Sequence, residues 1–214
     1  MKMKVLNLEK MLPADLPPGE QILWFGRPNA TSLWRRAYRA DIVATYFAAL
    51  AIWGFFASAP MVAPGAALLQ ALINLGVGVA ALAILGGLAY LSSRTMLYVV
   101  TTRRIVLKVG IALPIFHNVP FAQIESAGLR AFGDGTGDIA VKLVGKQRIA
   151  YQTLWPSARP FHLRYPEPTL RCIPGAREVA NVLTRAMIEA KGGRSGLVVE
   201  PQRSAPALAT AAHA

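Results

Sequence analysis

The sequence predicts an α+β membrane protein, in which a two-helix transmembrane hairpin carries a small β-barrel or sandwich capped by a C-terminal helix. Three patterns along the chain predict this class, and the overall composition supports it. Ile42 to Leu91 contain no Asp, Glu, Lys, Arg or His. Segments rich in β-branched residues follow this stretch, and a helical repeat comes near the end. Hydrophobic residues make up 54% of the 214 residues and charged residues 16%, against about 25% charged in a typical soluble domain.

The uncharged stretch is long enough for two membrane spans, because about 20 residues cross the hydrocarbon core. Pro60 and Pro64 divide it. We therefore expect a hairpin over residues 41–92, with helices at about 42–59 and 65–91. A buried helix pair of a soluble protein would show a polar face, and neither segment has one.

Arginines flank the predicted hairpin on both sides, whereas the loop between the helices carries no charge. By the positive-inside rule, the chain is expected to be a multi-pass protein of the cytoplasmic (inner) membrane with both termini cytoplasmic. The net charge of +12 fits this reading. The same arginines are the candidate lipid-facing residues: Arg35, Arg36, Arg39, Arg94, Arg103 and Arg104.

The remaining chain divides into a cytoplasmic lead-in (1–40), a β-rich domain (93–191) and a disordered tail (192–214). In the helix that opens after Gly175, Val179, Leu183 and Met187 belong to one apolar stripe. GDGTGD, residues 133–138, predicts a hairpin turn. The strand candidates are Gln21 to Phe25, Thr95 to Gly110 (one strand or a hairpin arm), Val119 to Arg130, Asp138 to Val144 and Arg148 to Leu154.

Three motifs after the hairpin resemble the bacterial pleckstrin-homology (PH) domain of the PH2 type: YVVTTRRI (98–105), VPFAQIESA (119–127) and GTGDI (135–139). The segment LPPGEQILWFGRPN (16–29) resembles the lead-in of such proteins. LWPSARPFHLRYPEPTLRCIPGAREVANVL (154–183) is similar to the PuhB family of photosynthetic-complex assembly proteins in purple bacteria. These resemblances imply a PH-like fold and a role in building the reaction centre and core light-harvesting complex. They imply no catalytic or ligand residue.

The residues themselves predict no catalytic, cofactor-binding or metal site, so we expect a protein that is not an enzyme and holds no cofactor. Cys172 is the single cysteine, and no orienting group or oxyanion-hole motif accompanies the Cys172/His162 pair. The spans contain no His, which argues against a stable pigment ligand. No stretch interleaves aromatic and basic residues on a polar strand, so nucleic acid is not expected as a partner.

The proline-rich segment from Trp155 to Pro174 is predicted to be a stiff, extended loop. Aromatic residues and arginines often anchor interfaces. This loop either binds a partner or wraps its own barrel. The candidate partner-binding residues are Trp155, Arg159, Phe161, Arg164, Tyr165 and Arg171.

Two functions stay open at this level. One is a non-catalytic assembly factor whose partners are reaction-centre or core light-harvesting polypeptides. The alternative is a membrane-anchored PH-like module that reads anionic membrane lipids or scaffolds other membrane proteins. The client subunit and the formation of a homodimer are not specified by the sequence.

Overall fold

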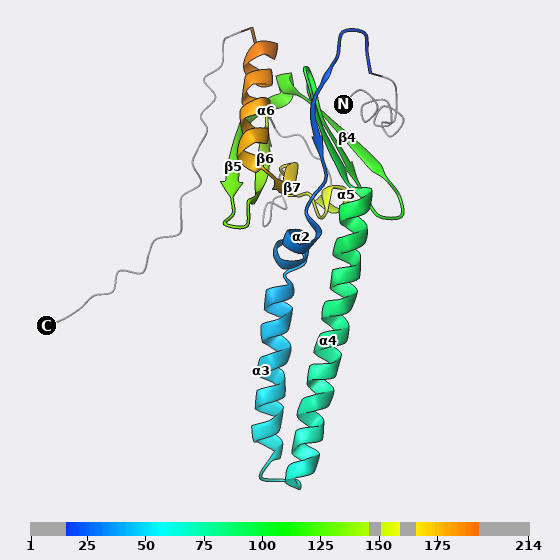
Figure 1. Cartoon of the computed structure of the whole chain (residues 1–214), viewed down its shortest axis with the longest axis vertical. Coiled ribbons are helices and arrows are strands. Elements are labelled where there is room, and N and C mark those ends of the chain that lie inside the picture. Colours follow the sequence, from blue (N-terminus) through cyan, green and yellow to red (C-terminus); the bar gives the residue numbers. More distant parts are fainter. Residues whose placement is uncertain (1–15, 146–150, 159–165, 193–214) are drawn as a thin grey trace, which may run out of the picture.

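A β-domain stands on a long helical hairpin in the computed structural model, which describes residues 16–145, 151–158 and 166–192 (Figure 1). The domain consists of two antiparallel sheets and a C-terminal helix. The first sheet has the order β1 (Ile22–Gly26), β2 (Leu97–Thr101), β3 (Arg104–Val109), β4 (Ile115–Pro120). The second has the order β5 (Ile124–Ala131), β6 (Thr136–Leu143), β7 (Thr169–Pro174), and α6 (Ala176–Ala190) follows it.

The two sheets and α6 enclose one apolar core. Tyr98, Ile139, Leu170 and Leu183 are fully or almost fully buried in it. The helical repeat correctly identified the inner face of α6, since Val179, Leu183 and Met187 are buried there. Each large apolar side chain removed from water contributes roughly 1.5–3 kcal/mol, so this core supplies most of the domain's stability.

The lead-in is part of the domain rather than a segment ahead of it. β1 pairs with β2 across the whole hairpin, and Thr102 N donates to the Gln21 carbonyl oxygen (3.0 Å). The helical hairpin is thus inserted between the first two strands of one sheet. The sequence predicted strand β1 almost at its observed position, but its pairing partner lies far along the chain and leaves no local signal.

Three strand predictions need correction. Val119 to Arg130 is not one strand, because it contains the end of β4, a short 3-10 helix η1 (Phe121–Gln123) and most of β5. Thr95 to Gly110 contains two strands, β2 and β3, because the chain reverses at Thr101, whose hydroxyl accepts from the Arg104 amide (3.0 Å). The strand predicted at Arg148 to Leu154 is wrong for residues 151–154, which form the short helix α5 (Tyr151–Leu154). Residues 148–150 lie outside the described residues. The third strand of the second sheet is β7, from the segment predicted as a loop.

The hairpin consists of α3 (Ala40–Ser58) and α4 (Pro64–Thr95), each long and apolar enough to cross a membrane. At 1.5 Å per residue the 32-residue α4 is roughly 48 Å long, well beyond the ~30 Å hydrocarbon core. Gly78 brings the helices together, because a Cβ there would stand 2.7 Å from Phe47 Cβ. The last turns of α4 are buried at Ala89 and Ser92, and Met96 links the helix directly to β2.

Candidate functional site

A short helix, α2 (Ala30–Arg36), joins β1 to the hairpin and packs beside β7 of the second sheet. Asn29 caps it, since its Oδ1 accepts from Ser32 N (3.0 Å) and fills one of the free donors of the first turn. The backbone N–H of Asn29 donates to the carbonyl oxygen of Cys172 in β7 (2.8 Å). Leu33, fully buried, fixes the inner face of α2. The start of α2 is therefore tied to the domain before the membrane-length helices begin.

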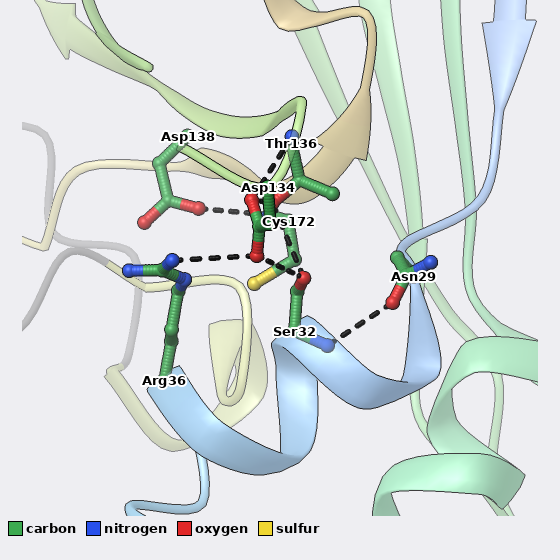
Figure 2. A network of polar contacts seen from close by, with 7 residues as sticks. All are labelled: Asn29, Ser32, Arg36, Asp134, Thr136, Asp138 and Cys172. Atoms are coloured by element: carbon green, nitrogen blue, oxygen red, sulfur yellow. Dashed lines mark hydrogen bonds and ion pairs between the residues drawn. The ribbon is translucent and has the colours of Figure 1, made fainter. Parts of the chain in front are cut away.

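Asp134, in the turn between β5 and β6, holds α2 from the other side (Figure 2). Its Oδ2 accepts from Ser32 Oγ (2.8 Å) and Arg36 Nη2 (3.3 Å), and its Oδ1 accepts from Thr136 Oγ1 (2.6 Å) and Thr136 N (3.1 Å). These bonds, above all the one from the Thr136 hydroxyl, lower the pKa of Asp134 far below its ordinary value. The Arg36 guanidinium also stacks 3.6 Å from the centre of the Phe132 ring.

A buried ion pair completes this junction, which we define as Asn29, Ser32, Arg36, Asp134, Thr136, Asp138, Arg171 and Cys172. Arg171 Nε lies 3.6 Å from Asp138 Oδ2, and the Cys172 amide donates to Asp138 Oδ1 (2.7 Å). Arg171 further donates to the carbonyl oxygens of Arg36 (3.3 Å) and Pro156 (3.4 Å). One side chain thus joins β7, the end of α2 and the segment after α5.

Cys172 contributes a buried free thiol to the junction. Burial, and secondarily the negative charge of Asp138, raise the pKa of its thiol to about 12. Its backbone has a φ of 51°, in the left-handed region, close to the irregularity in the β6–β7 register between Gly137 and Ile139. Burial and the raised pKa therefore keep the thiol protonated at neutral pH.

An aromatic contact closes the side of the junction that faces α4. The Tyr38 hydroxyl shares a hydrogen bond with Ser92 Oγ (2.8 Å), and its ring meets Trp155 edge to face, with centroids 5.2 Å apart. Trp155 stays 45% exposed. Tyr98, fully buried, bonds Ser157 Oγ through its hydroxyl (2.7 Å). The segment around Trp155 is therefore held against both the hairpin and the core.

The candidate partner-binding residues occupy different environments. Trp155 presents part of its ring to the outside. Arg171 is buried, and its guanidinium contacts Asp138 and the carbonyl oxygens of Arg36 and Pro156. Arg159, Phe161, Arg164 and Tyr165 lie outside the described residues.

The candidate lipid-facing arginines separate into two groups along the molecule. Arg35, Arg39 and Arg94 are exposed beside the ends of α2, α3 and α4, and Arg36 belongs to the junction. Arg103 and Arg104 lie at the opposite end of β2, away from the hairpin. There Arg104 binds Glu20 through two bonds, Nε to Oε1 (2.9 Å) and Nη2 to Oε2 (3.1 Å).

The GDGTGD turn was predicted at its observed place, but neither helix α2 nor its contact with the turn was predicted. A signal was present in the paired short polar residues, Asn29 before a helix and Asp134 in a turn, which are typical capping residues. Nothing in the sequence indicated that they meet. Among residues 16–145, 151–158 and 166–192, no group of three or more His, Cys, Asp or Glu side chains is placed to hold a metal ion.

Two antiparallel sheets and a C-terminal helix, with the hairpin inserted after the first strand, define a PH-like protein on a helical stalk. A family model described as bacterial PH domain matches residues 43–187. A Rhodobacter capsulatus protein, described as an uncharacterized 23.7 kDa protein in the puhA 5' region, is 36% identical over 206 residues, 94% of each chain. No solved structure matches. The chain belongs to the bacterial PH domain family, and its similarity to the R. capsulatus protein confirms the PuhB resemblance.

Proposed function

We propose that the chain is a non-catalytic assembly factor for the photosynthetic reaction centre and core light-harvesting complex. The observation that carries this proposal is the similarity, over nearly the whole chain, to the protein in the R. capsulatus puhA 5' region. The PuhB resemblance implies the same role. A role for the intact architecture, hairpin and domain together, is supported because the similarity covers both.

The hairpin anchors the protein in the cytoplasmic membrane in this proposal. Large apolar side chains point outward along both helices, among them Trp53, Phe56 and Ile84, each at least 65% exposed. Such a surface is costly in water and suited to lipid or to another helix. The exposed Arg35, Arg39 and Arg94 at the domain end of the hairpin favour a cytoplasmic domain and cytoplasmic termini.

The junction would give the assembly factor a fixed geometry. α4 runs into β2 through one residue, and α2 is tied to the β5–β6 turn and to β7 by the Asp134 and Arg171 bonds. A client helix packed on α3 or α4 is therefore held at a set position relative to the domain and to Trp155. The factor would shield the client's apolar surface until the partner subunit displaces it.

Co-purification tests the proposal. Tagged full-length protein is extracted from photosynthetically growing cells in a gentle detergent, and the eluate is characterised by mass spectrometry and absorption spectroscopy. We expect reaction-centre or core light-harvesting polypeptides to be enriched over an untagged strain. An Asp138→Ala variant, whose junction is broken, should capture less, whereas Glu125→Ala at an exposed ion pair should capture as much as wild type. Eluates that hold no photosynthetic polypeptide would overturn the proposal.

The exposed arginines favour a second candidate, a module that reads anionic lipid. Each basic residue near an anionic surface contributes about 1 kcal/mol. The triple variant Arg35→Gln, Arg39→Gln, Arg94→Gln should then lose anionic lipid that co-purifies with the wild type. If client capture survives this loss, lipid reading is not the main function.

A further inference from the structure

We propose that the loop between β3 and β4, residues 110–114, together with Ile115 at the start of β4, dips into the cytoplasmic headgroup region of the bilayer and forms a second membrane contact for the domain. The occupant of this apolar tip is lipid. The inference rests on the proposed insertion of the hairpin, and the experiment below separates the two.

The strand register places the loop at the membrane end of the domain. β2 leads away from α4, and β3 returns antiparallel to it, so that Lys108 pairs with Leu97, two residues after the end of α4. The loop after Val109 therefore lies beside the last turn of α4, as Figure 1 shows. Tyr90 and Leu91, about half exposed, extend the apolar surface of α4 nearly to this level.

The loop presents apolar side chains where a solvated loop would carry polar ones. Residues 111–115 read IALPI, and all five are exposed. Leu113 is 79% exposed, more than any other large apolar side chain of the described residues except Met61 in the hairpin tip. Gly110, at φ 108°, holds the turn tight, because a Cβ there would collide with the Leu113 carbonyl oxygen. This conformation therefore requires a glycine at position 110.

The surroundings of the tip match the lipid interface. Lys108 lies over the Phe116 ring (5.5 Å) and Arg94 over the Tyr90 ring (5.1 Å). No Asp or Glu occurs between Leu97 and Pro120. Apolar residues flanked by aromatic and basic side chains are typical of segments that lie in the headgroup region. These charges favour an anionic membrane over a second protein as the occupant.

Lipid-depth fluorescence of the full chain tests the proposal. Leu113→Cys is labelled with an environment-sensitive fluorophore and reconstituted in vesicles of phosphatidylcholine and phosphatidylglycerol, with and without spin-labelled quencher lipid. Cys172 is buried and stays unlabelled. Val144→Cys is the matched control, because Val144 is an exposed apolar residue at the opposite end of the domain, after β6. Leu75→Cys, in the middle of α4, reports insertion of the hairpin.

We expect the label at Leu113 to shift to the blue and to lose fluorescence to the quencher lipid, while the label at Val144 does neither. Ile111→Cys provides a second position should the first variant fold poorly. A water-exposed signal at both loop positions with quenching at Leu75 would overturn the loop proposal and leave the anchor intact. A blue shift without lipid quenching, which indicates protein contact, would overturn it as well. Absence of quenching at Leu75 would instead contradict the membrane anchor itself.

Discussion

Two loops at the hairpin end of the domain differ in chemistry: one is polar and hydrogen-bonded to the chain, and the other is apolar and exposed. The β5–β6 turn is polar, and its Asp134 is bonded to Ser32, Arg36 and Thr136. The β3–β4 loop is apolar, and its side chains point outward. The first loop fixes the domain on its own hairpin, whereas the second offers a surface to something outside the chain.

The β5–β6 turn is therefore expected to contribute to the stability of the fold, and the β3–β4 loop to contacts outside the chain. A hydrogen bond at the turn is lost when either partner is replaced, so a substitution there should lower the free energy of unfolding. A substitution in the β3–β4 loop should change the stability in detergent only slightly, because residues 111–115 are exposed. Effects on unfolding should therefore be large at the junction and small at the loop.

The largest expected effect comes from Asp138→Ala. It leaves the Arg171 guanidinium buried and unpaired and removes the acceptor of the Cys172 amide, which should lower the free energy of unfolding by about 3–5 kcal/mol. Thermal unfolding in detergent, followed by circular dichroism, measures this loss. Glu125→Ala breaks an exposed pair with Lys142 and should cost at most about 1 kcal/mol. Equal losses in both variants would show that the Asp138–Arg171 pair stabilises the fold no more than an exposed ion pair does.

The thiol of Cys172 should resist chemical labelling as long as the junction stays folded. With its pKa raised to about 12, the thiol is neutral at pH 8, and its burial excludes reagents. A maleimide should label it only after denaturation, as mass spectrometry would show. Rapid labelling of the native protein would mean that β7 opens readily. In Asp138→Ala the labelling rate should rise.

A smaller, pH-dependent effect is expected for Asp134→Asn. The folded state lowers the pKa of Asp134, so the carboxylate stabilises the fold above its unfolded pKa of about 3.9, and this contribution is lost as the pH falls below that value. The melting temperature of the variant should lie below that of wild type at pH 7, and the gap should narrow below about pH 4. A gap that is constant with pH would assign the loss to shape rather than to charge.

The smallest effect on stability is expected for Leu113→Ser. The side chain is 79% exposed, so unfolding in detergent should change by no more than about 0.5 kcal/mol. A loss comparable with that of Asp138→Ala would show that the loop packs onto the chain, and would remove the contrast between the two loops.

The sequence predicted those parts of the fold that depend on local pattern. The uncharged stretch gave α3 and α4, the apolar stripe gave α6, and Gly133 to Asp138 gave the turn. It failed where pairing is between distant segments. β1 joins β2 across the hairpin, and β7 is a strand only because β6 provides its partner. The predicted tail from residue 193 onward lies outside the described residues.

The candidate site was predicted only in part for the same reason. Positive charge at the hairpin ends was visible, but the sequence did not distinguish the exposed Arg94 from Arg104, which binds Glu20. Trp155 stays a candidate partner-binding residue: it is 45% exposed, and its edge-to-face contact with Tyr38 was not predicted from the sequence. The junction partners Ser32 and Asp134 are 102 positions apart, and only the folded chain brings them together.

Deletion of the gene, followed by complementation, tests the assembly role most directly. Near-infrared absorption of membranes measures the assembled reaction centre and core light-harvesting complex, and extracted pigment measures its synthesis. We expect the deletion strain to lose assembled complex while it retains pigment synthesis. Wild-type protein and Glu125→Ala should restore the complex, and Asp138→Ala should not do so at equal protein level. Normal complex levels in the deletion strain would contradict the assembly role.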